Sequence, residues 1–174
     1  MKGEISASLA RFVASSRWDD LPPSVKREAK RALLNISGCI IAGLRLNQFE
    51  FDDRAVVLGA AANALDFDDT HLPTVIHPGP PVGAALFALA EKWDFSGREL
   101  LHAYVLGVEA ACRIGNIVSP GHYQHGWHIT STCGVFGVAA VAFLVSIAFV
   151  RPLVERPGSR TGTLAMATVE DAER

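Results

Sequence analysis

Apolar residues recur along most of the chain at the three- and four-residue spacing of an amphipathic helix. Val25, Ala29, Leu33, Ile36 and Ile40 fall on one face of such a helix. The same periodicity, or an unbroken run of small apolar residues, predicts helices at 5–16, 24–44, 55–65, 82–93, 96–117 and 129–150. Because no segment shows the two-residue alternation of a strand, we predict an all-α fold resembling a helical bundle.

Proline, glycine and capping residues separate these segments. Residues 70–81 contain four prolines and one glycine and are expected to form a loop, and residues 119–127 are expected to form a second one. Ser96 followed by Glu99 matches a capping box at a helix start. After residue 150 the apolar periodicity stops. We therefore expect one helical domain at 1–150 and a poorly packed tail at 151–174, with a short helix at 169–173.

Composition narrows the class of protein. The chain has 174 residues, of which 49% are hydrophobic and 20% charged, as in a folded globular domain. The formal net charge of −2 and the lack of a basic stripe argue against nucleic acid as a partner. Three widely spaced cysteines suggest free thiols in a reducing cytoplasm. The N-terminus carries Glu4 and Arg11 and lacks the long apolar core of a secretory signal.

One apolar segment raises the question of a membrane. Residues 134–150 contain no charge over 17 positions, which is at the short limit for crossing a bilayer. A helix that is apolar on every side is either buried in protein or in lipid. Its glycines and alanines favour the buried helix, so we expect no membrane partner.

The densest group of reactive side chains follows the alanine-rich segment. Three carboxylates, a hydroxyl and two imidazoles fall within twelve residues; they are Asp66, Asp68, Asp69, Thr70, His71 and His77. If the helix continues through Asp69, then Asp66 and Asp69 share a face while Asp68 points elsewhere. Crowded carboxylates raise one another's pKa, which favours proton transfer. Acidic residues at a helix C-terminus are otherwise disfavoured by the helix dipole, so we predict a functional site here.

A second group of imidazoles lies in the loop at 119–127 and at the helix start that follows. His122, His125 and His128 recur every three residues, and on a helix they would nearly align as metal ligands. Pro120 and Gly126 instead favour a loop that leads into a helix N-terminus, where backbone N–H groups favour an anion. His128 would then act as a proton carrier, while His122 and His125 are expected to be surface residues.

Four motifs, in this order, carry a family resemblance: ALDFDDTH, HPG, SGRELLHAYVLGVEAACRIG and GWHITSTCGVFGVAA. Together with the opening helices they resemble the helical domain of the MmgE/PrpD family, over residues 8–143. That family includes 2-methylcitrate dehydratase, cis-aconitate decarboxylase and iminodisuccinate epimerase. The resemblance implies a metal-independent lyase or isomerase without a cofactor, acting on small di- or tricarboxylates.

The resemblance also implies site residues and partners. Asp66, Thr70, His77 and His128 match family active-site residues by position, whereas Asp69 and His71 receive no role. The family site lies between the helical domain and a smaller lid domain, and members are usually homodimers. We expect His128 or His77 to be the base, the other an acid or carboxylate clamp, Asp66 to fix an imidazole tautomer, and Thr70 to bind substrate.

The chain departs from the family pattern in three places. It is much shorter than family members and lacks a lid, the connection at 44–55 is short, and the resemblance fades after Phe143. A tail produced by a frameshift or a truncated gene would explain the last departure. The chain has four lysines, and all of them lie away from both motifs. A tricarboxylate pocket without a cation would bind poorly, so we expect the isolated chain to be inactive or to need a lid-bearing subunit.

Two other functions stay open at this point. The first is a helical remnant without enzymatic activity, which associates through exposed apolar helices. The second is a metal-dependent hydrolase that uses Asp68, Asp69, His71 and the three histidines at 122, 125 and 128.

Overall fold

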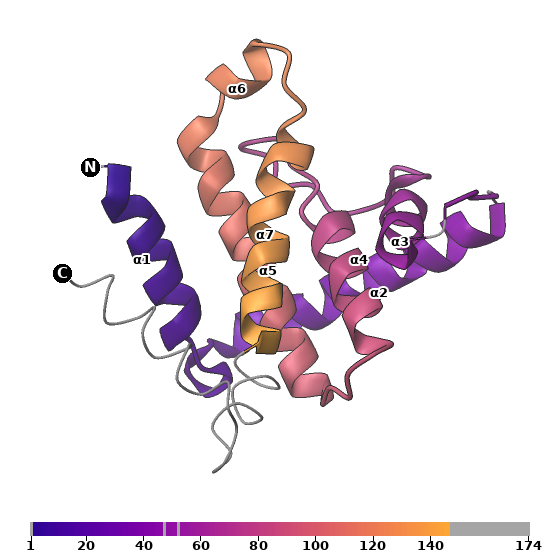
Figure 1. The fold of residues 1–174 in the computed structure, drawn as a ribbon, viewed down its shortest axis with the longest axis horizontal. Helices are drawn as coiled ribbons and strands as arrows, with labels where there is room; N and C mark the ends of the chain where they lie inside the picture. The colour runs from indigo at the N-terminus through magenta and orange to yellow at the C-terminus, as the bar shows by residue number, and fades with distance from the viewer. Residues whose placement is uncertain (1, 47, 52, 147–174) are drawn as a thin grey trace, which may run out of the picture. The chain divides into compact units, whose positions relative to one another are not determined.

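The computed structural model describes residues 2–46, 48–51 and 53–146 of the chain. Seven α-helices and one 3₁₀ helix span these residues: α1 (Lys2–Ser15), η1 (Trp18–Asp20), α2 (Pro23–Leu46), α3 (Arg54–Asn63), α4 (Gly79–Ala90), α5 (Gly97–Val118), α6 (Gly121–Gln124) and α7 (Ile129–Val145) (Figure 1). Among the described residues the only β-type pairing is an isolated bridge between His71 and Ile76. The predicted all-α class is confirmed.

Most helix boundaries lie within three residues of the predicted ones, although α7 ends at Val145 rather than at residue 150, and two local differences have a clear cause. α4 begins at Gly79 rather than at residue 82, because Pro80 and Pro81 occupy its first turn, where a missing N–H costs nothing. The loop at 119–127 contains the four-residue helix α6. The capping box is present as predicted, with Ser96 Oγ accepting from the Glu99 amide at 3.2 Å and Glu99 Oε2 accepting from the Ser96 amide at 2.8 Å.

The chain divides into two compact units, Met1–Val141 and Ala142–Arg174. Residues 147–174 lie outside the described residues, and with them the predicted tail and its short helix. No helix in the described part of the chain combines the length and the apolar character needed to cross a bilayer.

Within the first unit the helices pack closely at small residues. Gly43 of α2 lies against the Ala61 carbonyl of α3, so that a side chain at residue 43 would clash with it. Gly83 of α4 faces Ile36 of α2, and a Cβ there would lie 3.1 Å from Ile36 Cγ1. These contacts place the end of α3 and the start of α4 beside the same helix.

The loop between α3 and α4 is anchored by a small apolar cluster. Ile76 of the loop is fully buried with Ile129 and Cys133 of α7, and the half-buried Ile114 and Val118 of α5 pack against them. Ile76 precedes His77 and Ile129 follows His128 in the sequence. Burial of these two isoleucines in one cluster therefore brings both histidines to the same region.

Candidate active site

The polypeptide turns away from the helix axis before it reaches the aspartates. α3 ends at Asn63, and Asp66 has a φ of 56°, in the left-handed region that aspartate tolerates better than most residues. The helix predicted at 55–65 therefore does not continue through Asp69, and Asp66 and Asp69 do not share a helical face. Asp69 instead turns toward α4 and accepts a hydrogen bond from the Gly79 amide at 2.9 Å.

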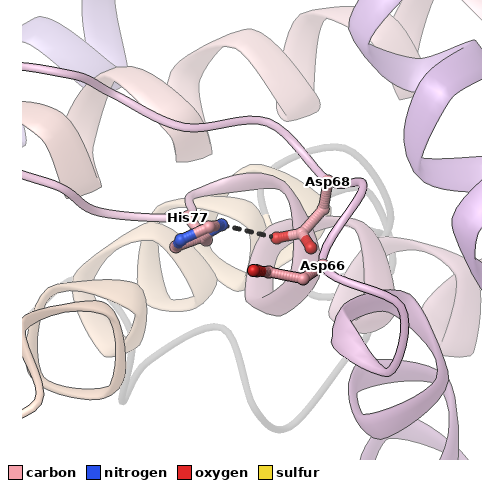
Figure 2. Close-up of side chains that lie close together, drawn as sticks. All are labelled: Asp66, Asp68 and His77. Carbon is pink, nitrogen blue, oxygen red and sulfur yellow. Dashed lines mark hydrogen bonds and ion pairs between the residues drawn. The ribbon is translucent and has the colours of Figure 1, made fainter.

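Asp68 is the buried carboxylate of the site. Its side chain is fully buried, and its Oδ2 lies 2.9 Å from Nδ1 of His77, whose side chain is 27% exposed (Figure 2). The Asn63 amide donates to both oxygens of Asp68, at 3.2 and 3.3 Å. The carboxylate bonded to His77 is thus Asp68, whereas the sequence suggested Asp66 as the residue that fixes an imidazole tautomer.

The backbone of His77 is attached to the first turn of α7. The His77 amide donates to Thr130 Oγ1 at 3.0 Å, across 53 residues of sequence. Since Ile76 and Ile129 also share one apolar cluster, the loop is fixed to α7 by a hydrogen bond and by packing.

His128 immediately precedes α7 and interacts with its exposed N-terminus. The Ser131 amide donates to His128 Nδ1 at 3.3 Å, and Ser131 Oγ lies 3.0 Å from the same nitrogen. Backbone N–H groups in the first turn of a helix have no partner within the helix, so an imidazole nitrogen can satisfy one of them.

One cavity of about 500 Å³ brings these elements together. Asp66, His77 and His128 line it, while the exposed Thr70 does not. The other lining residues are Gly59, Asn63, Pro80, Pro81, Thr130, Ser131, Gly134, Val135 and Val138. The described wall contains no lysine or arginine, and half of its twelve lining residues carry polar side chains.

The remaining histidines of the two motifs are held elsewhere. His71 Nδ1 pairs with Thr74 Oγ1 at 2.7 Å, His122 Nε2 with Thr132 Oγ1 at 2.9 Å, and His125 Nδ1 with the Gly121 carbonyl at 2.6 Å. The ligand set suggested for a metal hydrolase is therefore not gathered among the described residues.

A different set of side chains has its ligand atoms close enough together to bind a cation. Ligand atoms of Asp66, Asp68 and His77 lie within 4.8 Å of one another, the only such group in the described part of the chain. Asp68 and His77 are already bonded to each other, and Asp68 also to Asn63. A metal would have to replace these bonds, so the arrangement fits an oriented imidazole better than a preformed metal site.

Burial raises the pKa of two side chains, Asp69 and Tyr104. The pKa of Asp69 is raised, chiefly by burial and further by the charge of Asp68, while the Gly79 hydrogen bond opposes the shift. Burial, with the charges of both aspartates, also raises the pKa of Tyr104. The Tyr104 hydroxyl is buried and has no hydrogen-bond partner among the described residues.

Comparison with known proteins identifies the family. The MmgE/PrpD N-terminal domain matches residues 47–143, more than half of the chain. The chain belongs to the MmgE/PrpD family.

Curated relatives in this family are cis-aconitate decarboxylases and a protein like them. A cis-aconitate decarboxylase-like protein of Aspergillus oryzae is 27% identical, over 81% of this chain and 36% of its own length. The Aspergillus terreus cis-aconitate decarboxylase is 28% identical, over 81% of this chain and 34% of its own length. The human enzyme is 37% identical, over 51% of this chain and 19% of its length. This chain thus spans about a third or less of these relatives.

Sequence reasoning missed four groups in this MmgE/PrpD domain. The sequence pattern does not point to Asn63, Thr130 or Ser131, and it places Asp68 in the carboxylate cluster and among possible metal ligands without predicting its bond to His77. Asp68 could have been recognised, since a carboxylate beside buried helices requires a hydrogen-bonded partner. The other three have no local signal, because their roles depend on contacts made after folding.

Proposed function

We propose that this chain carries the acid–base part of a carboxylate lyase site that acts on a small di- or tricarboxylate of the 2-methylcitrate or cis-aconitate kind. One observation supports this most directly: His77 and His128, far apart in the sequence, line the same cavity. The names of the curated relatives, which are cis-aconitate decarboxylases or proteins like them, support a substrate of this class.

Dehydration and decarboxylation of a carboxylic acid both depend on side chains that transfer protons. In a dehydration, a base removes the proton from carbon beside a carboxylate, and an acid gives a proton to the departing hydroxyl, which leaves as water. In a decarboxylation, CO₂ leaves, and the carbanion that remains is protonated by an acid. Imidazoles serve in both roles near neutral pH. Asp66, on the same wall, is proposed to contact the substrate, whereas Thr70, for which the same role was expected, lies outside the cavity lining.

Substrate carboxylates also need cations, and the described cavity wall has none. Charge-assisted hydrogen bonds to carboxylates are among the strongest available to a protein. We therefore propose that a lid-bearing region or a partner subunit, as in a homodimer, completes the site. No metal or cofactor is required, and the reducing cytoplasm is the proposed compartment.

A chimera tests the function, because the rest of a relative supplies the region proposed to complete the site. Residues 53–141 of this chain replace the matching segment of the Aspergillus oryzae relative, and turnover of cis-aconitate and 2-methylcitrate is followed by absorbance and product analysis. We expect an active chimera in which His77→Gln or His128→Gln lowers kcat by about 100-fold or more, the typical contribution of general acid–base catalysis.

The matched control is His125→Gln, since His125 is exposed and does not line the cavity. Turnover that survives both His77→Gln and His128→Gln in an otherwise active chimera would refute the proposed acid–base roles. Activity lost on treatment with a chelator would instead favour metal chemistry.

A further inference from the structure

We infer that the protein holds its two cavity imidazoles in opposite neutral tautomers, His77 with its proton on Nδ1 and His128 with its proton on Nε2, and that Asp68 is the positioning residue for His77. The tautomers follow from hydrogen bonds within this chain. Their use in catalysis rests on the function proposed above.

The tautomer of His77 follows from the chemistry of its partner. An ionised carboxylate accepts hydrogen bonds and cannot donate one. Asp68 Oδ2 lies 2.9 Å from His77 Nδ1, so this nitrogen must carry the proton. The other ring nitrogen, Nε2, lies on the side away from Asp68 (Figure 2), and its lone pair accepts no hydrogen bond from the described part of the chain.

The tautomer of His128 follows from the opposite constraint. A backbone N–H can only donate, and the Ser131 amide donates to His128 Nδ1. That nitrogen must therefore be bare, and in the neutral ring the proton lies on Nε2. The Ser131 hydroxyl, 3.0 Å from the same nitrogen, can donate as well and strengthens the preference.

These constraints give the cavity two different groups. His77 presents a lone pair that can remove a proton, and His128 presents an N–H that can donate to a departing hydroxyl or to a carboxylate oxygen. The sequence left open which histidine is the base, and the hydrogen bonds favour His77.

Asn63 makes the effect of Asp68 testable. Because the Asn63 amide donates to Asp68, an asparagine at residue 68 would turn its own carbonyl toward Asn63 and its NH₂ toward His77. His77 Nδ1 would then have to accept, and its proton would move to Nε2. Replacing an orienting carboxylate by an amide selects the wrong imidazole tautomer in the same way in a catalytic triad.

Nitrogen-15 NMR of the full chain tests the inference directly. The chain is labelled with ¹⁵N-histidine and studied at a pH of about 8.5, where unperturbed imidazole is neutral. Long-range ¹H–¹⁵N correlations distinguish protonated from bare ring nitrogens, and His→Gln variants assign the rings. We expect a protonated Nδ1 in His77 and a protonated Nε2 in His128. The same tautomer in both rings, or fast averaging in either, overturns the inference.

Two matched pairs of variants separate positioning from general damage. Asp68→Asn should move the His77 proton to Nε2, whereas Asp66→Asn, the same change two residues away, should leave it on Nδ1. Ser131→Pro removes the amide donor in the first turn of α7 and should release His128 into a mixture of tautomers, whereas Ser131→Ala keeps the amide and the tautomer. An Asp68→Asn variant that keeps Nδ1–H would show that Asp68 does not position the ring.

The failure of this inference can be distinguished from that of the proposed function. Opposite tautomers in a chain whose chimera turns over no carboxylate would refute the function alone. An active chimera with identical tautomers would refute the inference alone.

Discussion

Gly79 is the first residue of α4, and its lack of a side chain is what allows the aspartate loop to dock. A Cβ at this position would overlap Asp69 Oδ1 and lie 2.9 Å from Asp69 Cγ. The Gly79 amide donates to the same carboxylate. Gly79→Ala should therefore expel the Asp69 side chain and break the bond that fixes the loop to the helix.

The size of the effect follows from that bond. A hydrogen bond to a charged group contributes about 1.5–3 kcal/mol, and the displaced carboxylate adds steric cost, so Gly79→Ala should lower the free energy of unfolding by about 3 kcal/mol. Asp69→Ala should cost about 2 kcal/mol because it leaves the buried Gly79 amide unpaired. In the double variant the new methyl group occupies the space of the lost carboxylate. The total should stay near 2–3 kcal/mol, rather than the sum of about 5.

Urea unfolding of the full chain, followed by far-UV circular dichroism, measures all four corners of this double-mutant cycle. Gly97→Ala is the matched control, because Gly97 is the first residue of α5 and a Cβ there meets nothing within 4 Å. It should be neutral or slightly stabilising. Additive losses, within about 0.5 kcal/mol, for Gly79→Ala and Asp69→Ala would show that the two residues do not contact each other.

Four further predictions concern single side chains. The folded-state pKa of Asp69 is raised, so stability should fall as pH rises from 3.8 through the raised value. Asp69→Asn keeps the acceptor for Gly79, and urea titrations at pH 4 and 7 should show its stability relative to wild type increasing with pH. Tyr104→Phe removes a buried hydroxyl without a partner and should raise the free energy of unfolding by about 1 kcal/mol in the same assay. Ser96→Ala removes the capping box of α5 and should cost about 1 kcal/mol, measured as a shift in the urea midpoint. Burial raises the pKa of Cys112 to about 11. Its alkylation by iodoacetamide at neutral pH, followed by peptide mass spectrometry, should be on the order of a hundredfold slower in the folded chain than in urea.

Each of these predictions has a result that contradicts it. Exposed Asp94→Asn is the control for Asp69, and an equal pH trend in both variants would remove burial as the cause. A destabilised Tyr104→Phe would mean that the hydroxyl has a partner. An unchanged midpoint for Ser96→Ala would show that the cap adds nothing, and rapid alkylation of the folded chain would show that Cys112 is accessible.

The fold was largely readable from the sequence because most of its elements are long amphipathic or apolar helices. Periodicity located α2 and α5, and the capping box located the start of α5. The pattern predicts the start of α4 three residues too late, because prolines such as Pro80 and Pro81 are typical of loops and also suit a first helical turn.

The sequence predicted only part of the candidate site. The motifs identified Asp66, His77 and His128, which line one cavity, and also Thr70, which does not. The carboxylate bonded to His77 is Asp68 rather than Asp66, because the chain leaves the helix after Asn63 and Asp66 adopts a left-handed conformation that the sequence pattern does not predict. The bond from His77 to Thr130 crosses 53 residues, and no local pattern encodes it.

Both histidines are hydrogen-bonded to the first turn of α7. Thr130 binds the backbone amide of His77, and the amide of Ser131 binds the ring of His128. The spacing between the two rings is therefore set over a single helical turn. Val135 and Val138 line the cavity farther along α7. Because neither valine makes a hydrogen bond to a histidine, substitutions at these two positions would change the shape of the cavity while the bonds that hold His77 and His128 stay in place.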